Sequence, residues 1–160
     1  MVYKTKLGEI EVPEDDVITF EDGIPGFERL KKFSVVSNGS DPIFWLVSLE
    51  DPSVALPVVN PWIIRVDYAI EIPSDVMEEL GIEREEDVNI WAVLVIPEDD
   101  PTSMTVNLMA PIVVNSKKGK GKQIILEGSG YGIRHSVREE MERSKKIMES
   151  LKDVEVSAGG

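Results

Sequence analysis

Cysteine is absent from this chain of 160 residues, and histidine occurs only once. Without cysteine the chain can form neither disulfides nor thiolate metal sites, which fits a reducing compartment. No stretch approaches the roughly 20 apolar residues that span a membrane, and the first residues lack the apolar core of a signal peptide. We therefore expect a cytoplasmic protein that does not enter a membrane.

Positive charge is also scarce, because 17 Lys and Arg face 30 Asp and Glu and the formal net charge is −13. An acidic surface repels nucleic acid and anionic lipid and attracts basic proteins. The charge therefore argues against direct nucleic-acid binding, although it also fits a surface that serves solubility alone. The hydrophobic share of 42% over 160 residues is enough for the core of one domain.

Motifs for catalysis are missing as well. The single histidine, His135, makes no metal cluster, and the chain has neither a cysteine nucleophile nor a Gly-x-Ser-x-Gly elbow. The glycine-rich stretch 128–132 lacks the Gly-x-x-x-x-Gly-Lys pattern, and the carboxylates at 98–100 lack the alternating spacing of a calcium loop. We expect no enzyme, no cofactor and no bound metal. The alternative is a small hydrolase that uses His135 with nearby carboxylates.

Short apolar stretches separated by Pro, Gly, Asn and Asp fill most of the first 130 residues. Their length and their β-branched residues predict strands. The expected strands are 3–7, 9–12, 17–20, 31–37, 43–49, 55–59, 63–72, 88–96, 104–109, 112–115 and 123–127. The nearly continuous apolar run 88–96 indicates a strand buried on both faces. The pattern predicts a mainly β fold, either an antiparallel β-barrel-like fold or a sandwich.

Two helices accompany the strands. A short one is expected from Ser74, as N-cap, to a stop at Gly81. A longer amphipathic helix begins at the capping-box pattern of Ser136 and Glu139 and runs to about Lys152. Its apolar stripe consists of Val137, Met141, Met148 and Leu151, with Ser144 in line. We expect this helix to pack on the sheet; docking on a partner is the alternative.

The domain prediction follows from these elements. Residues 1–152 form a single β-rich domain that includes the helix at about 136–152, and residues 153–160 form a flexible tail. Four lysines crowd the stretch 116–122, which we expect to be a solvated hairpin tip. An anion contact is the alternative for these lysines.

Two segments stand out for their shape. Residues 20–28, Phe-Glu-Asp-Gly-Ile-Pro-Gly-Phe-Glu, predict a tightly shaped loop, because glycine reaches positive φ and proline fixes φ. The apolar side chains of Ile24 and Phe27 either plug the edge of the core or stay available to a partner. The second segment, 104–115, predicts a strand that bends at Ala110-Pro111 and then continues to Asn115.

Together these segments resemble the flagellar assembly factor family, FliW. The loop Gly23–Glu28 and the segment 104–115 are similar to two hallmarks of that family, and the lysine hairpin with Gln123 follows the second. The stretches 45–52, 56–61, 67–68 and 131–135 resemble matching family stretches in the same order. The resemblance covers about residues 3–136 and leaves out the C-terminal helix.

The resemblance implies a β-rich, barrel-like, cytoplasmic protein without cofactor or catalysis. It further implies binding to newly made flagellin and to the RNA-binding translational repressor CsrA. The two partners compete, so that flagellin synthesis is coupled to flagellum assembly. We expect the free protein to be monomeric. The alternative is a generic acidic module for another basic protein, with the helix from Val137 as its contact.

Partner contact is assigned first to the loop, at Ile24, Pro25, Gly26, Phe27 and Glu28. Asn107 and Pro111 fall at the second hallmark and are also candidates. Both have a structural explanation, because Asn107 can satisfy backbone groups at a bend and Pro111 can end strand pairing.

Overall fold

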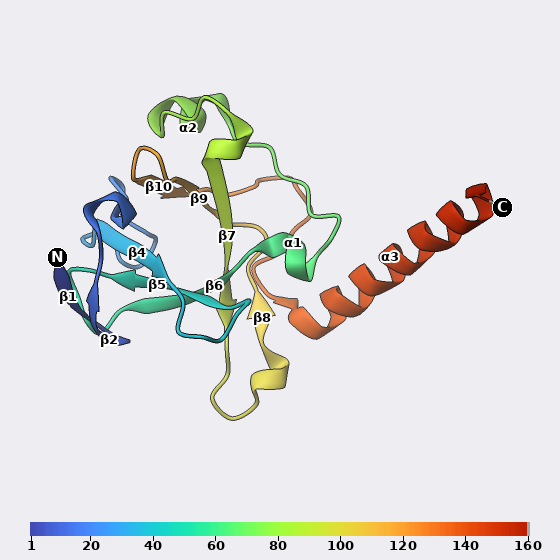
Figure 1. Ribbon diagram of the computed structural model, residues 1–160, viewed down its shortest axis with the longest axis horizontal. Coiled ribbons are helices and arrows are strands. Elements are labelled where there is room, and N and C mark those ends of the chain that lie inside the picture. The colour runs from blue at the N-terminus through green and yellow to red at the C-terminus, as the bar shows by residue number, and fades with distance from the viewer. Residues whose placement is uncertain (160) are drawn as a thin grey trace.

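Seven strands close into a barrel in this computed structural model, which describes the backbone of residues 1–159 and the side chains of residues 1–152 (Figure 1). Around the barrel the order is β7 (Val88–Val95), β6 (Ala55–Val59), β5 (Phe44–Ser48), β4 (Lys32–Val36), β3 (Ile18–Thr19), β10 (Lys120–Gln123) and β9 (Ile112–Asn115). β9 pairs with β7 and closes the ring. The neighbours are antiparallel except β10 and β3. The predicted mainly β fold is confirmed, in its barrel form.

The inside of the barrel is filled by alternate residues of its strands, as the two-residue period of a strand requires. Phe33, Leu46, Val58 and Ile112 belong to this inner cluster and are almost completely buried. The residues between them face outward: Val47 joins one outer cluster, and Val59 and Val113 join another.

One outer cluster lies under the N-terminal hairpin of β1 (Val2–Thr5) and β2 (Gly8–Glu11). Val12 packs there on Val47 and Leu49, and the short η1 (Glu14–Asp16) then leads into β3. The strands expected at 3–7 and 9–12 are therefore present but begin one residue earlier, and the strand expected at 17–20 is reduced to the two residues of β3.

The other outer cluster lies on the outward face of β7, under α1 (Pro61–Ile64), α2 (Ser74–Glu79) and the segments that follow them. Ile90, Ala92 and Leu94 of β7 are buried in it, whereas Trp91 and Val93 face the inner cluster and are only partly buried. The expectation that β7 is buried on both faces therefore holds for Ile90, Ala92 and Leu94 on the outward face and only in part for the inner face.

The strand expected at 63–72 is wrong. The side chain of Asn60 accepts a hydrogen bond from the backbone N–H of Trp62, and Pro61 occupies the first helical position, so a helical turn starts here. After Arg65 the chain runs without strand pairing to Pro73. The apolar residues of this stretch cover β7 from outside, which is why they mimic a strand in the sequence.

The short helix α2 is present, with one correction at its start. Pro73 holds the N-cap position and Ser74 is the first helical residue, without a side-chain cap. The stop at Gly81 is confirmed, since Gly81 has φ +64° and the N–H of Ile82 bonds back to the carbonyl of Met77 at 2.8 Å. The short η2 (Glu85–Asp87) then leads into β7.

The segment after β7 differs in detail from the expected strands. η3 (Pro101–Ser103) precedes β8 (Thr105–Val106), which is much shorter than 104–109, and the second strand of the lysine hairpin is Lys120–Gln123 instead of 123–127. Only residues 116–119 are therefore the tip. β11 (His135–Ser136) pairs with β8 and leads directly into the last helix.

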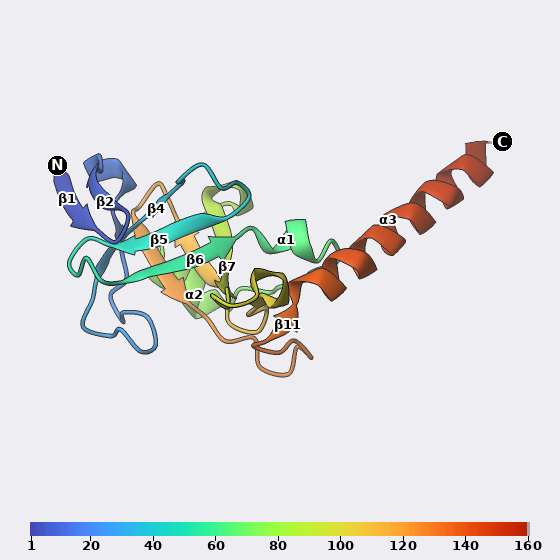
Figure 2. The same ribbon diagram turned by 90° about the horizontal axis from the view of Figure 1, so that it is seen from below.

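Helix α3 (Val137–Gly159) projects from the barrel in both views (Figures 1 and 2). Its stripe does not pack on the sheet as expected: Val137 and Ser144 are buried, but Met141, Met148 and Leu151 are each about half exposed. The helix also continues past the expected end near Lys152. The flexible tail stays a prediction, because the side chains from residue 153 onward and all of Gly160 lie outside the described residues.

Candidate functional site

The loop Gly23–Glu28 has the defined shape that its sequence predicts. The N–H of Phe27 bonds to the carbonyl of Ile24 at 2.7 Å, with Pro25 and Gly26 between them. Gly26 has φ +92°, so the turn is type II, in which proline and glycine favour these two positions. The N–H of Gly26 also donates to the Glu28 carboxylate at 3.0 Å, and this bond lowers the pKa of Glu28.

The loop presents only part of itself to solvent. Ile24 is 2% exposed and belongs to the inner cluster, so it is the core plug of the loop. Phe27 is half-buried against the same cluster, whereas Pro25, Gly26 and Glu28 are exposed. The turn and the Glu28 carboxylate are therefore open to solvent, Phe27 is so in part, and Ile24 is not.

Acidic residues stand on both sides of this turn in the sequence. Glu21, Asp22 and Glu28 are all exposed. The ammonium of Lys122 lies 2.9 Å from both Asp22 and Glu79 and so ties the loop to β10 and α2. This pairing raises the pKa of Lys122, chiefly through its hydrogen bond to Glu79, and lowers the pKa of Asp22.

The hairpin lysines are thus partly neutralised within the chain. In addition to Lys122, Lys117 at the tip pairs with Asp87 at 2.9 Å. These pairs favour the interpretation of 116–122 as a solvated hairpin over that of an anion site.

Asn107 and Pro111 delimit a bulge between β8 and β9. Both strands run along the same edge of β7, but the register shifts between them, and residues 107–111 absorb the shift. The side-chain oxygen of Asn107 accepts from the N–H groups of Met109 and Ala110, at 3.1 and 3.0 Å. Pro111 is buried. The predicted bend is confirmed.

Surrounding segments satisfy the rest of this bulge. The carbonyl of Leu108 accepts from the hydroxyl of Tyr68 at 2.6 Å, and that of Ala110 accepts from the amide of Gln123 at 3.0 Å. Burial raises the pKa of Tyr68, so its hydroxyl stays protonated and remains a donor. Asn107 and Pro111 therefore have the structural roles foreseen for them, and their contact with a partner stays a prediction.

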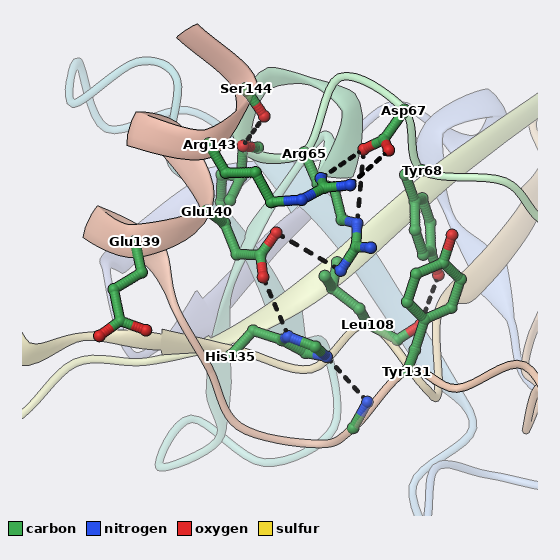
Figure 3. Close-up of polar contacts among 12 residues, drawn as sticks. Arg65, Asp67, Tyr68, Leu108, Tyr131, His135, Glu139, Glu140, Arg143 and Ser144 are labelled. Carbon is green, nitrogen blue, oxygen red and sulfur yellow. Dashed lines mark hydrogen bonds and ion pairs between the residues drawn. The ribbon is translucent and has the colours of Figure 1, made fainter. Parts of the chain in front are cut away.

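His135 lies in a polar network at the base of α3 (Figure 3). The N–H of Gly132 donates to its Nε2 at 2.8 Å, so Nδ1 carries the proton and faces the Glu140 carboxylate at 3.2 Å. Both ring nitrogens are therefore used, and His135 has none free to act as a general base. This geometry removes the support for the hydrolase alternative.

The same network holds α3 to the barrel. Arg65 lies 3.5 Å from Glu140 and stacks over the ring of Tyr131 at 4.8 Å. One turn further along α3, the buried hydroxyl of Ser144 donates to the carbonyl of Ile64 at 2.8 Å and accepts from the N–H of Val66 at 3.0 Å. Among the residues whose side chains the structure describes, these contacts fix the beginning of the helix, and the exposed apolar side chains lie beyond or beside it.

Asp67 and Arg143 complete this anchor with two parallel hydrogen bonds of 2.7 Å each. The bond to Arg143 lowers the pKa of Asp67 to about 2. A carboxyl whose pKa is lower in the folded chain than in the unfolded chain stabilises the fold at pH values above the unfolded-state pKa. That contribution is lost as the pH falls toward 2. Because both side chains are 42% exposed, solvent screening keeps the contribution below about 1 kcal/mol.

We therefore expect Asp67→Asn to destabilise the chain slightly at pH 7 and by less at pH 2.5. Urea unfolding of both proteins at the two pH values measures the difference. Asp41→Asn is the control, because among the described residues the Asp41 carboxylate accepts one hydrogen bond, from the Ser37 hydroxyl. A stability difference for Asp67→Asn that stays the same at both pH values would contradict the role of the ion pair.

Sequence reasoning missed this anchor because its members lie far apart in the chain. The one visible signal was Ser144, a polar residue in the apolar stripe of the helix. Among the residues that the structure describes, no group of three or more His, Cys, Asp or Glu can hold a metal ion. Within the same part of the chain, no helix has the length and apolar character needed to cross a bilayer.

The fold and the site define a small closed β-barrel protein with a shaped acidic loop and a projecting C-terminal helix. A family model described as "FliW protein" matches residues 1–137, up to the start of α3. The flagellar assembly factor FliW of Thermosipho africanus is 56% identical over 140 residues, which cover 87% of this chain and 97% of that protein. That of Thermotoga maritima is 51% identical over 149 residues, which cover 92% of this chain and 100% of that protein.

A solved structure agrees with these matches. The crystal structure of a flagellar assembly factor FliW superposes with a TM-score of 0.80 at 33% identity, and covers 86% of this chain and 96% of the other. The chain belongs to the FliW family of flagellar assembly factors. The resemblance drawn from the loop and the bulge is therefore confirmed.

Proposed function

We propose that this chain works in the cytoplasm by binding flagellin and the translational repressor CsrA in competition, and that it catalyses no reaction. Its membership of the FliW family, matched over residues 1–137, is the observation that carries this proposal. In this role the chain couples flagellin synthesis to flagellum assembly, because flagellin that accumulates occupies it and releases the repressor.

The charge of the chain supports binding of an RNA-binding protein. A net charge of −13 disfavours contact with RNA itself and favours a partner with a basic surface. Charge complementarity of this kind speeds encounter and selects the partner more than it adds affinity. Exposed Glu21 and Glu28 put such charge beside the turn of the loop.

Binding is tested with the purified full chain immobilised and with purified flagellin and CsrA of the same organism applied separately. At about 10 µM, complexes with a binding free energy near −8 kcal/mol are well populated. Capture of each partner, with no capture of a basic protein of similar size such as lysozyme, is the expected result. If neither partner is retained, the proposed function is wrong.

The loop is expected to take part in this binding. Replacing Phe27 by Ala removes a half-buried aromatic side chain next to the exposed turn, and we expect partner affinity to fall about tenfold or more. Phe44→Ala is the matched control, since Phe44 is also a half-buried ring packed on the inner cluster. Calorimetric titration with each partner measures the affinity, and melting curves measure the loss of stability that both variants share.

Equal affinity losses for the two variants would show that Phe27 acts only through stability. An early melting transition of Phe27→Ala alone, with no specific loss of binding at low temperature, would likewise assign Phe27 to the core.

A further inference from the structure

The stretch 69–73 contains no helix, turn or bend, and it pairs with no strand in the part of the chain that the structure describes. The N–H of Ala69 donates to the hydroxyl of Tyr131 at 2.9 Å. In contrast, within the part of the chain that the structure describes, no hydrogen bond involves the backbone N–H or carbonyl groups of residues 70–72. An extended segment with unpaired donors and acceptors is a template for the addition of another strand.

A second unpaired edge lies opposite, just after β10. The N–H of Ile124 bonds to the carbonyl of Pro111 at 3.0 Å, and the N–H of Leu126 bonds to that of Met109 at 2.7 Å. Alternate residues of an extended chain direct their polar groups to opposite sides, so the N–H and carbonyl of Ile125 point away from the bulge. Neither group has a hydrogen-bond partner among the described residues, and the Ile125 side chain is 59% exposed.

An open groove separates the two edges. Residues 69–74 form one wall and residues 125–127 form the other, while Tyr131 and Ser129 complete the lining. Figure 1 shows the segment that connects α1 to α2 next to the segment that follows β10. The groove is apolar at Ile70, Ile72 and Ile125 and carries the carboxylates of Glu71 and Glu127, without a Lys or Arg in its lining.

We propose that this groove binds an extended peptide of a partner protein by strand addition, and that the peptide alternates apolar side chains with Lys or Arg. Backbone hydrogen bonds to the 70–72 edge and to Ile125 give affinity, and alternate side chains give specificity. Ile70 and Ile72 lie on one face of their segment and Glu71 on the other, so they contact the apolar and the basic side chains respectively, and Glu127 adds negative charge on the second wall. A helical ligand leaves both edges unpaired, and an acidic peptide is repelled. The site does not require that the partner be flagellin or CsrA.

The test uses a fluorescein-labelled peptide of alternating valine and lysine, seven residues long, and fluorescence anisotropy with the full chain. Two matched peptides are compared with it: one has glutamate in place of lysine, and the other carries N-methyl groups on alternate amides, which removes the donors of one peptide edge. We expect saturable binding of the lysine peptide and at least about tenfold weaker binding of both others. Two N-methyl peptides are made, one methylated on the odd-numbered amides and one on the even-numbered amides, so that each hydrogen-bonding edge of the peptide is tested.

Variants of the chain locate the binding. Ile125→Arg places a positive charge in the groove and is expected to weaken binding of the lysine peptide at least about tenfold. Val95→Arg is the matched control, because Val95 is 58% exposed and lies on β7 beside β8, away from the groove lining. Glu71→Lys provides a second test at an exposed position if Ile125→Arg does not fold.

Several outcomes would overturn the site. One is that the lysine peptide and both N-methyl peptides bind equally well. Another is that the groove variants bind the lysine peptide as well as Val95→Arg does. The third is that binding does not saturate up to about 1 mM peptide, which corresponds to a binding free energy near −4 kcal/mol. Each of these leaves the proposed binding of flagellin and CsrA untouched, because that binding is measured with the whole partners.

Discussion

Replacing Gly23 by Ala is expected to lower the free energy of unfolding by about 3 kcal/mol or more. Gly23 has φ +69°, a left-handed conformation that costs a residue with a Cβ about 1–2 kcal/mol. A Cβ at this position would also lie 2.5 Å from both Cα and the carbonyl oxygen of Glu28. Because those are backbone atoms of the same tight loop, they cannot move aside without opening the turn that Ile24 anchors in the core.

Gly26→Ala is the internal control for this prediction. Gly26 also has a positive φ, +92°, but a Cβ there meets no atom within 4 Å. It should therefore lose only the conformational term, about 1 kcal/mol. Urea unfolding of the three proteins measures both losses. If Gly23→Ala and Gly26→Ala lower the free energy of unfolding by the same amount, the close approach of Gly23 to Glu28 does not contribute to the cost of the Gly23 substitution.

Replacing Phe20 by Ala is expected to have the other large effect, about 3–5 kcal/mol. The Phe20 side chain is fully buried, with its ring edge-to-face on Phe33 at 5.4 Å between centroids. It also covers Gly121 of β10, where a Cβ would lie 2.7 Å from the ring and 2.9 Å from Ile18. Phe20 thus joins the start of the loop to the inner core and to β10.

A double-mutant cycle separates this packing from simple loss of apolar area. Gly121→Ala alone is expected to cost about 1–3 kcal/mol, because overpacking forces the Phe20 ring to shift. In the Phe20→Ala background the ring is gone, so the same substitution should cost clearly less. Denaturant unfolding of the four proteins gives the coupling. Strictly additive losses would show that Phe20 and Gly121 do not constrain each other.

Much of the fold follows from local sequence patterns. Short β-branched stretches divided by turn residues locate most strands, and their alternation fills the inside of the barrel with residues such as Phe33 and Leu46. The closure of the ring between β7 and β9, and the parallel pairing of β3 with β10, are not visible locally, because they join segments far apart in the chain.

The errors have physical causes. The stretch 63–72 has the apolar content of a strand, but the cap of Asn60 and the fixed φ of Pro61 start a helical turn first. The stripe of α3 has the correct periodicity, but periodicity does not say what covers a helix. The barrel takes only the first turns, through Val137 and Ser144, so Met148 and Leu151 stay exposed.

The candidate site was predictable to a similar degree. The Pro25-Gly26 turn and the bend at Asn107 follow from residue types whose backbone preferences are strong. The burial of Ile24 and the exposure of Glu28 depend on tertiary packing and appear only in the structure. The groove between residues 69–74 and 125–127 also could not be predicted from the sequence, since the two segments come together only through the fold.

The central claim is that flagellin and CsrA compete for this chain, and competition between purified proteins tests it most directly. The complex of the chain with CsrA is formed first, flagellin is added in increasing amounts, and size-exclusion chromatography with light scattering follows each species. The proposed function predicts that CsrA leaves as free protein in proportion to the flagellin bound. A stable complex of all three proteins, or CsrA that stays bound while flagellin remains free, would contradict it.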